Sequence, residues 1–221
     1  MELNSDLFSR DLLLLTALLY GAVLVTSLRL ARWRWIFAGR RIHLYLGTIL
    51  ILLVLWHLRA QAEATVAFHV LGVTTLTLMF GWSLAIIASA LILLGLTLNG
   101  RAEWEMFALN GLLSGVLPIT LSQISLLLVR TYLPKNFFIF VLGNGFLTAG
   151  LAAVFSIWIG LLLLVVGGVY SYAKISEVYF PFLPMLFFPE AFLNGWAVTA
   201  LTCYRPEWIY AFSDELYLHG K

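Results

Sequence analysis

The stretch that decides the fold runs from Ala64 to Gly100 and reads ATVAFHVLGVTTLTLMFGWSLAIIASALILLGLTLNG, thirty-seven residues without a formal charge. A second stretch, from Asn136 to Ala173, continues for thirty-eight residues in the same way. A water-soluble domain of 221 residues could not present such stretches at its surface. Hydrophobic residues make up 62% of the chain, charged residues 11%, and mean hydropathy is +0.97. We therefore expect an integral membrane protein.

The apolar segments predict helices rather than the strands of a membrane barrel. Only helices and closed barrels satisfy the backbone in lipid, and a core of about 30 Å asks for about 20 apolar residues per helix. Barrel strands would alternate over about ten residues. The chain instead has solid apolar runs at Leu12 to Leu28, Ile42 to Leu58 and Met106 to Val129. The fold class is therefore all-α.

The two uncharged stretches need to be divided into spans. A straight helix from Ala64 to Gly100 would be about 55 Å long, too long for one crossing, and Gly81-Trp82-Ser83 lies near its middle. We expect a tight hairpin there between two short helices. The stretch 136 to 173 is either one long, tilted or kinked helix or a hairpin, and we favour one helix. A last segment from Phe182 to Cys203 brings the count to seven.

Basic residues predict how the bundle is oriented, because Lys and Arg in short loops prefer the cytoplasmic side. With the N-terminus outside and the C-terminus in the cytoplasm, the outer side keeps Arg10, Arg59, Arg101 and Lys174. The cytoplasmic side then receives Arg29, Arg32, Arg34, Arg40, Arg41, Arg130, Lys135, Arg205 and Lys221. We expect one transmembrane domain over residues 1–221, with an extracytoplasmic segment 1–10 and a short cytoplasmic tail 205–221. The expected location is the cytoplasmic (inner) membrane, crossed several times.

Several function classes are disfavoured by the sequence. A signal peptide fits poorly, because Glu2, Asp6 and Asp11 outnumber Arg10 before the first apolar run. The net charge of +2 comes from arginines between the first two helices, which fit topology and lipid headgroups better than a nucleic-acid partner. No phosphate-binding loop, G-x-S-x-G or H-E-x-x-H pattern occurs, so we expect no enzyme and no ATP hydrolysis by this chain. The single cysteine excludes an internal disulfide.

Polar residues inside the spans carry the functional signal, because each costs about 2.5–3.5 kcal/mol at mid-bilayer. His69 at the start of the expected third helix, Asn110 in the fifth and Glu190 in the seventh map to the same end as the N-terminus and Glu2. His69 alone would be read as a buried hydrogen-bonding group and Asn110 as helix-packing glue. Glu190 has few polar neighbours in sequence, so it must find a partner in space or stay protonated. His57 lies near the same end and is an alternative member of such a site.

These residues resemble a known family. Ala67-Phe68-His69-Val70-Leu71-Gly72, Leu109-Asn110 and the closing Pro189-Glu190-Ala191-Phe192-Leu193 with Arg205-Pro206-Glu207 look like cobalt and nickel uptake permeases of the CbiM type. These permeases are the substrate-capture components of energy-coupling-factor transporters. The similarity extends from about residue 1 to 208.

The resemblance implies a metal site and partners. The ligands would be the Met1 amine, the residue at position 2 and His69, while Asn110, Glu190 or His57 would support the site or ligate instead. The family has histidine at position 2, whereas this chain has Glu2. The implied cargo is a divalent ion, Co, Ni or Zn, with no organic cofactor. The implied partners are a coupling membrane subunit and ATPase subunits on other chains.

Two other functions stay open. The chain could keep the fold without transporting metal and act as an assembly or stabilising subunit of a larger complex. An intramembrane enzyme using His57, His69 and Glu190 around a metal is a third, weaker hypothesis. Small residues at Ala17 and Gly21, and at Gly111 and Gly115, would let helices approach closely, either within the chain or from a partner.

The charge bias generates a topology test. A reporter fused after Lys221 should read cytoplasmic, and a tag at Met1 should be reached from outside the cell. A C-terminal reporter found outside would contradict the seven-span count and require a hairpin between 136 and 173.

Overall fold

A computed structural model describes residues 2–3, 8–63 and 66–217 of the chain. For residues 2, 3, 59–63, 66, 67 and 216 it describes the backbone alone. The expectations on Met1, on the Glu2 side chain and on the last four residues therefore fall outside its description.

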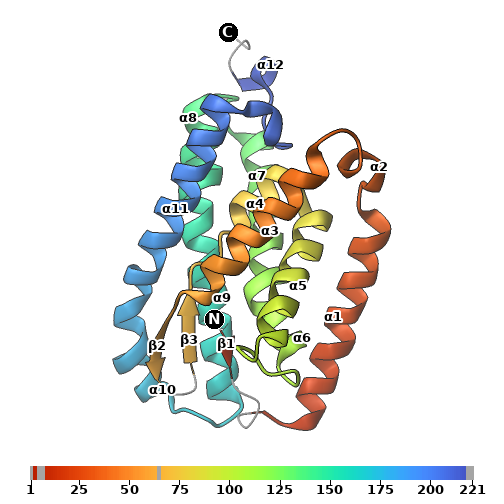
Figure 1. Cartoon of the computed structure of the whole chain (residues 1–221). Helices are drawn as coiled ribbons and strands as arrows, with labels where there is room; N and C mark the ends of the chain where they lie inside the picture. The colour runs from red at the N-terminus through yellow and green to blue at the C-terminus, as the bar shows by residue number, and fades with distance from the viewer. Residues whose placement is uncertain (1, 4–7, 64–65, 218–221) are drawn as a thin grey trace.

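The described residues form a helical bundle, which confirms the all-α membrane class (Figure 1). The main helices are α1 (Arg10–Leu30), α3 (Arg41–His57), α4 (Val73–Phe80), α5 (Trp82–Leu98), α7 (Leu117–Tyr132), α9 (Thr148–Val166) and α11 (Leu183–Tyr204). Short helices precede or link them: α2 (Trp33–Ile36), α6 (Phe107–Gly111), α8 (Phe137–Ile139), α10 (Tyr172–Lys174) and α12 (Asp214–Tyr217). Remaining turns are η2 (Leu112–Val116), η3 (Phe140–Leu147), η4 (Ile175–Tyr179), η5 (Phe180–Phe182) and η6 (Pro206–Trp208).

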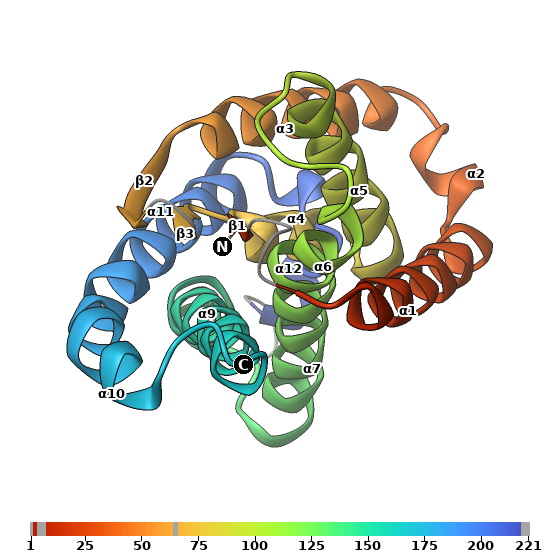
Figure 2. The same ribbon diagram turned by 90° about the horizontal axis from the view of Figure 1, so that it is seen from below.

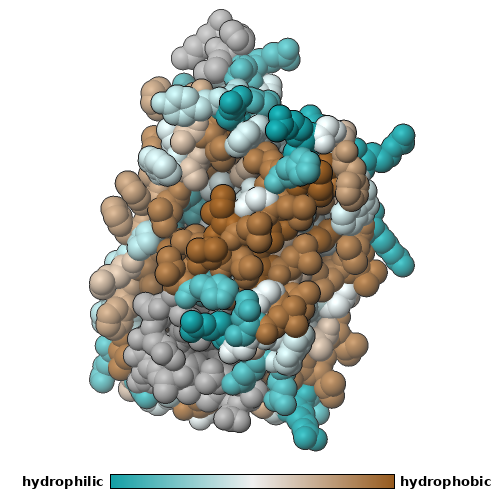
Figure 3. Space-filling view, viewed as in Figure 1, coloured by the Kyte–Doolittle hydropathy of each residue, from teal (hydrophilic) through white to brown (hydrophobic). Residues whose placement is uncertain are grey.

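Within the described part of the chain, three continuous helical segments are long and apolar enough to cross a membrane: Arg10–Leu30, Phe107–Tyr132 and Phe137–Val166. Shorter apolar helices are Arg41–His57 and Trp82–Leu98. Large apolar side chains are turned outward, among them Leu18 at 74% exposure and Val166 at 84%. On the face shown in Figure 3, a broad hydrophobic belt lies between more hydrophilic ends. Such a belt is favourable only against lipid.

The first uncharged stretch forms a hairpin at Gly81, as expected. The helix predicted for the first half of this stretch is wrong in its extent, because it begins only at Val73. Gly81, at φ 81°, ends α4 and starts α5. The described residues of this stretch before α4, 66–72, form no helix, however, and α4 has only eight residues. Gly72 itself has φ 67°, a left-handed conformation that a right-handed helix cannot continue through. At 1.5 Å per residue, α4 spans about 12 Å, less than half of a bilayer core.

A small antiparallel sheet takes the place of the missing helix. It consists of β1 (Glu2–Leu3), β2 (Arg59–Glu63) and β3 (Val66–His69), in the order β1-β3-β2. Glu2 pairs with Ala67 and Arg59 pairs with His69. The pairing supplies β3 with backbone partners on both sides, which makes a non-helical segment tolerable inside a membrane protein. Viewed from this end, β1 and β3 lie over the interior of the bundle (Figure 2).

The second uncharged stretch is one helix, as favoured from the sequence. It runs without a break from Phe137 to Val166 and includes the π-helical segment η3. Gly167 and Gly168 end it, and Gly168 has φ 73°. At roughly 45 Å, the helix exceeds the thickness of a bilayer core and must tilt or project.

The short helix α4 is the centre of the core. Seven of its eight residues are buried, and Leu76 and Leu78 are fully inaccessible. Its neighbours in the same apolar cluster come from α3, α5, α7, η3 and α11. Because α4 is enclosed on all sides, its position fixes the place of both segments attached to it.

The C-terminal segment packs on the bundle rather than projecting as a solvated tail. The backbone N–H groups of Tyr210 and Ala211 donate to the carbonyls of Met79 and Leu78, at 3.2 and 2.9 Å. Phe212 and Tyr217 are buried beside Phe140. Residues 209–217 therefore close the bundle over the end of α4.

Two of the small-residue positions serve packing within the chain. The Tyr20 ring lies against Gly111, and the Ser89 side chain lies against Gly115. Gly21 has open space where a side chain would be. The pair on the fifth span is thus used internally, whereas Gly21 is accessible to another helix.

The close approach of η3 to α11 gives a stability prediction. A methyl group at Gly195 would lie 2.2 Å from the Phe146 ring, so Gly195→Ala should lower the free energy of unfolding by about 1–3 kcal/mol. Gly47→Ala is the matched control, because Gly47 is also helical and nothing lies within 4 Å of the added methyl. Thermal unfolding in detergent measures both. An equal loss in both variants would contradict the packing described.

Candidate metal-capture site

His69 lies at the end of a strand, not at the head of a helix. It is the last residue of β3, and α4 begins at Val73. His69 lies at one end of the bundle, as the sequence predicts, but the backbone around it is extended. Because β1 runs antiparallel to β3 with Glu2 opposite Ala67, the amino-terminal end of β1 points along β3 toward His69. The fold thus places the backbone of Glu2 opposite a residue two positions before His69.

Trp56 holds the His69 ring from one side. The two ring centroids are 4.6 Å apart with planes inclined by 41°. The indole Nε1 of Trp56 also donates to the carbonyl oxygen of Leu71 at 2.8 Å. One buried aromatic side chain on α3 therefore positions both the imidazole and the turn that follows it.

Glu190 finds its partners in that same turn. Its carboxylate accepts hydrogen bonds from the backbone N–H of Leu71 and, at 3.4 Å, from that of Gly72. The Asn194 amide donates to Glu190 Oε2 at 2.9 Å. The carboxylate is 5% exposed. The isolated acid of the sequence is therefore hydrogen-bonded between α11 and the turn after β3.

Asn194, one turn further along α11, joins this helix to the start of α4. Its Oδ1 accepts from the backbone N–H of Thr75 at 3.0 Å and from the Thr75 hydroxyl at 2.8 Å. Gly72 is the N-cap residue of α4 and has no side chain to cap it. Asn194 supplies the capping oxygen from another helix, and the Glu190 carboxylate lies at the positive end of the α4 dipole.

Asn110 and His57 lie at the same end of the bundle. Asn110 is buried in α6, and its neighbour Leu109 belongs to the same apolar cluster as Phe68 of β3. His57 ends α3, with its Nδ1 2.8 Å from the Leu53 carbonyl oxygen. This local contact leaves the outer ring nitrogen, Nε2, as the atom through which His57 could reach a ligand.

The described side chains alone do not assemble a metal site. Among them, no group of three or more His, Cys, Asp or Glu side chains is placed to hold an ion. The expected ligand set includes Met1 and the Glu2 side chain, which lie outside that description. His69 is thus the member of the expected set whose surroundings are defined.

Sequence reasoning missed Trp56, Thr75 and Asn194. Asn194 follows Glu190 by four residues, so the two share one helix face, and this spacing was a usable signal. Trp56 stands next to His57 in an apolar run, where nothing distinguishes it from a lipid-facing aromatic residue. Its role arises from the return of β3 across the end of α3.

The described helices and their outward-facing apolar side chains define a multi-pass membrane protein. The family described as cobalt uptake substrate-specific transmembrane region, CbiM, matches residues 3–208, and the chain belongs to this family. The resemblance noted from the sequence is thereby confirmed. The family is one of membrane components of cobalt uptake, not of enzymes. No curated protein and no solved structure matches the chain.

The capping of α4 generates a second stability prediction. Glu190→Gln keeps the size of the side chain but replaces one accepting oxygen with an NH₂ group facing donors. We expect a loss of about 1–3 kcal/mol in the free energy of unfolding, because a buried N–H is left unsatisfied. Glu207→Gln is the control, since Glu207 makes an exposed ion pair with Arg205 at 3.7 Å. Denaturant titration in detergent that gave equal midpoints for Glu190→Gln and the unsubstituted chain would contradict the role of Glu190.

Proposed function

We propose that this chain is the substrate-capture membrane component of an energy-coupling-factor uptake system. Its cargo would be a divalent transition-metal ion: Co, Ni or Zn. The family membership supports the transport of cobalt-like ions. The observation that carries the proposal is the pairing of β1 with β3, which leads the start of the chain toward His69.

The proposed ligands are the Met1 amine, Glu2 and His69. An amine and an imidazole are nitrogen donors that suit Ni and Co, whereas a carboxylate at position 2 relaxes that preference toward Zn or Co. Glu2 therefore makes this chain different from the histidine pattern of the family. The metal preference follows from this substitution.

Two contacts support the proposed ligand His69 and the turn that follows it. Trp56 packs on the imidazole, and Glu190 holds the turn two residues further along the chain. Ligands held by such contacts keep their geometry when the ion arrives and leaves. Asn110 and His57 are placed to contribute from the same end, as supporting groups or alternative ligands.

The orientation proposed is N-terminus outside and C-terminus in the cytoplasm. Among the described residues, the helix ends and turns opposite the sheet carry eight Lys or Arg residues: Arg29, Arg32, Arg34, Arg40, Arg41, Arg130, Lys135 and Arg205. The sheet end carries four: Arg10, Arg59, Arg101 and Lys174. By the positive-inside rule, the end with more basic residues faces the cytoplasm, so the sheet and the candidate site face outward.

Energy for release must come from other chains. The sequence contains no phosphate-binding loop, so nothing in it couples ATP hydrolysis to movement. We propose a coupling membrane subunit and ATPase subunits as partners. Gly21 on α1, with open space beside it, is a position where a partner helix can approach closely. The single domain needs no organic cofactor or nucleic acid for this role.

A second candidate is an assembly subunit that has the fold without transporting metal. The replacement of the family histidine by Glu2 favours it, because a change at a ligand position is what loss of metal binding would produce. The two candidates differ in whether metal is held at all.

Metal analysis of the purified chain with a free N-terminus tests the site. We expect about one ion per chain, lost in His69→Ala and also when an N-terminal extension blocks the amine. Glu2→His should shift preference toward Ni, because it restores a third nitrogen donor. Acidic buffer should release the ion, since both nitrogen ligands must be deprotonated.

His43→Ala provides the matched control, because His43 lies in α3 at the end opposite the sheet. It should leave the metal content unchanged. Metal content unaffected by either His69→Ala or the N-terminal block would favour the assembly subunit instead.

A further inference from the structure

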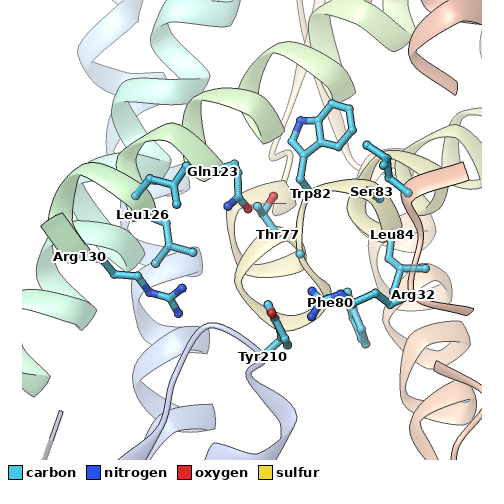
Figure 4. Close-up of a pocket in the computed structure, with 13 residues that line it drawn as sticks. Arg32, Thr77, Phe80, Trp82, Ser83, Leu84, Gln123, Leu126, Arg130 and Tyr210 are labelled. Atoms are coloured by element: carbon cyan, nitrogen blue, oxygen red, sulfur yellow. The ribbon is translucent and has the colours of Figure 1, made fainter. Parts of the chain in front are cut away.

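A cavity of about 370 Å³ lies at the end of the bundle opposite the sheet, distinct from the candidate metal site. It is lined by the end of α1 and the chain after it, the turn between α4 and α5, α7 and the C-terminal segment (Figure 4). Its charged lining residues are Arg32 and Arg130, and none of the lining residues is acidic. Two cations thus face one cavity.

Arg32 is held against the C-terminal segment and against the start of α5. Its guanidinium carbon lies 3.5 Å from the centroid of the Tyr210 ring. A Cβ at Gly81 would come within 2.9 Å of Arg32 Nη2, so the guanidinium lies directly on that glycine. Gly81 is the N-cap residue of α5.

Arg130 enters the cavity from α7 on the other side of the C-terminal segment. Its Nη2 donates to the carbonyl of Ala211, the residue after Tyr210. Its Nε is buried and has no hydrogen-bond partner among the described residues. The two arginines therefore flank consecutive residues, and one retains an unused donor.

The start of α5 adds positive potential of its own. The 17-residue helix has no side-chain cap, and its first residues Trp82, Ser83 and Leu84 line the cavity. The uncapped N–H groups of a helix start are donors, and the helix dipole makes this end positive. The charge of Arg32 adds to this positive potential, and both attract an anion.

Carboxylates of the chain do not provide that anion within the described residues. Neither Arg32 nor Arg130 makes an ion pair there, and the Arg205–Glu207 ion pair involves neither of them. The amide of Gln123 also lines the cavity and adds a neutral donor. The cavity is therefore lined by several hydrogen-bond donors, and none of its lining residues offers a negatively charged acceptor.

We propose that this cavity binds a phosphate group, held by Arg32, Arg130, Gln123 and the N–H groups at the start of α5. Guanidinium groups match phosphate oxygens in pairs, and helix starts are common phosphate sites. The phosphate can belong to a lipid headgroup or be free in solution, because Leu30, Leu126 and Leu127 border the cavity with apolar surface. The bound group joins three chain segments: the turn after α1, the α4–α5 turn and residues 210–211.

Thermal unfolding of the full chain in a neutral detergent tests the proposal with two probes. Inorganic phosphate is compared with chloride at equal ionic strength, and a soluble short-chain phosphatidic acid is compared with the same detergent alone. A bound phosphate raises the Tm in a concentration-dependent way. We expect Arg32→Gln and Arg130→Gln each to weaken the apparent affinity about tenfold to a hundredfold.

Arg34→Gln is the matched control, because Arg34 is an exposed arginine two residues from Arg32 that does not line the cavity. It should retain the full response. A response to the lipid alone assigns the site to a headgroup, and a response to both probes assigns it to the phosphate group from either source. Arg32 is exposed, so Arg32→Gln gives an answer even if the Arg130 variant does not fold. Absence of a response in the unsubstituted chain, or equal loss in Arg34→Gln, overturns the proposal.

Discussion

The bundle depends on how the start of α4 is capped. Gly72 leaves this helix start without a side chain of its own, and Glu190 and Asn194 of α11 supply the missing acceptors. An eight-residue helix has too few internal hydrogen bonds to be stable alone. Its stability comes from the core around it and from this cap. The same contacts hold the turn after His69, so the centre of the fold and the candidate site share one set of hydrogen bonds.

Much of the architecture could be predicted from composition and charge. The helical membrane class, the hairpin at Gly81 and the single helix across 136–173 follow from segment length, from the glycine that permits the turn and from the distribution of Lys and Arg. These properties are local in sequence. The strand at Val66–His69 is different, because extended backbone is tolerated there only through pairing with β1 and β2. The pairing with β1 joins residues more than sixty positions apart, and no pattern within the segment shows it.

In the candidate site, too, some features could be predicted from the sequence and others could not. Glu190 was identifiable as a polar group that needed a partner, since an acid in an apolar helix is unfavourable alone. The partner itself was not identifiable, because it is a backbone turn 119 residues earlier in the chain. Trp56 could not be distinguished from other aromatic residues near helix ends. Glu2 is the opposite case, where the sequence is more informative than the fold, since the chemical difference between carboxylate and imidazole is independent of position.

The residues that cap and cover α4 lie near the C-terminal end of the sequence, which affects how the helix forms during biosynthesis. Asn194, Tyr210 and Ala211 leave the ribosome long after α4 has been made, and each binds its backbone. During translation, the start of α4 therefore lacks its cap from Asn194, and its end lacks the contacts from Tyr210 and Ala211. Truncation before residue 194 would leave it in that state permanently. The nascent chain should consequently remain open to quality-control proteases until nearly all of it has been synthesised.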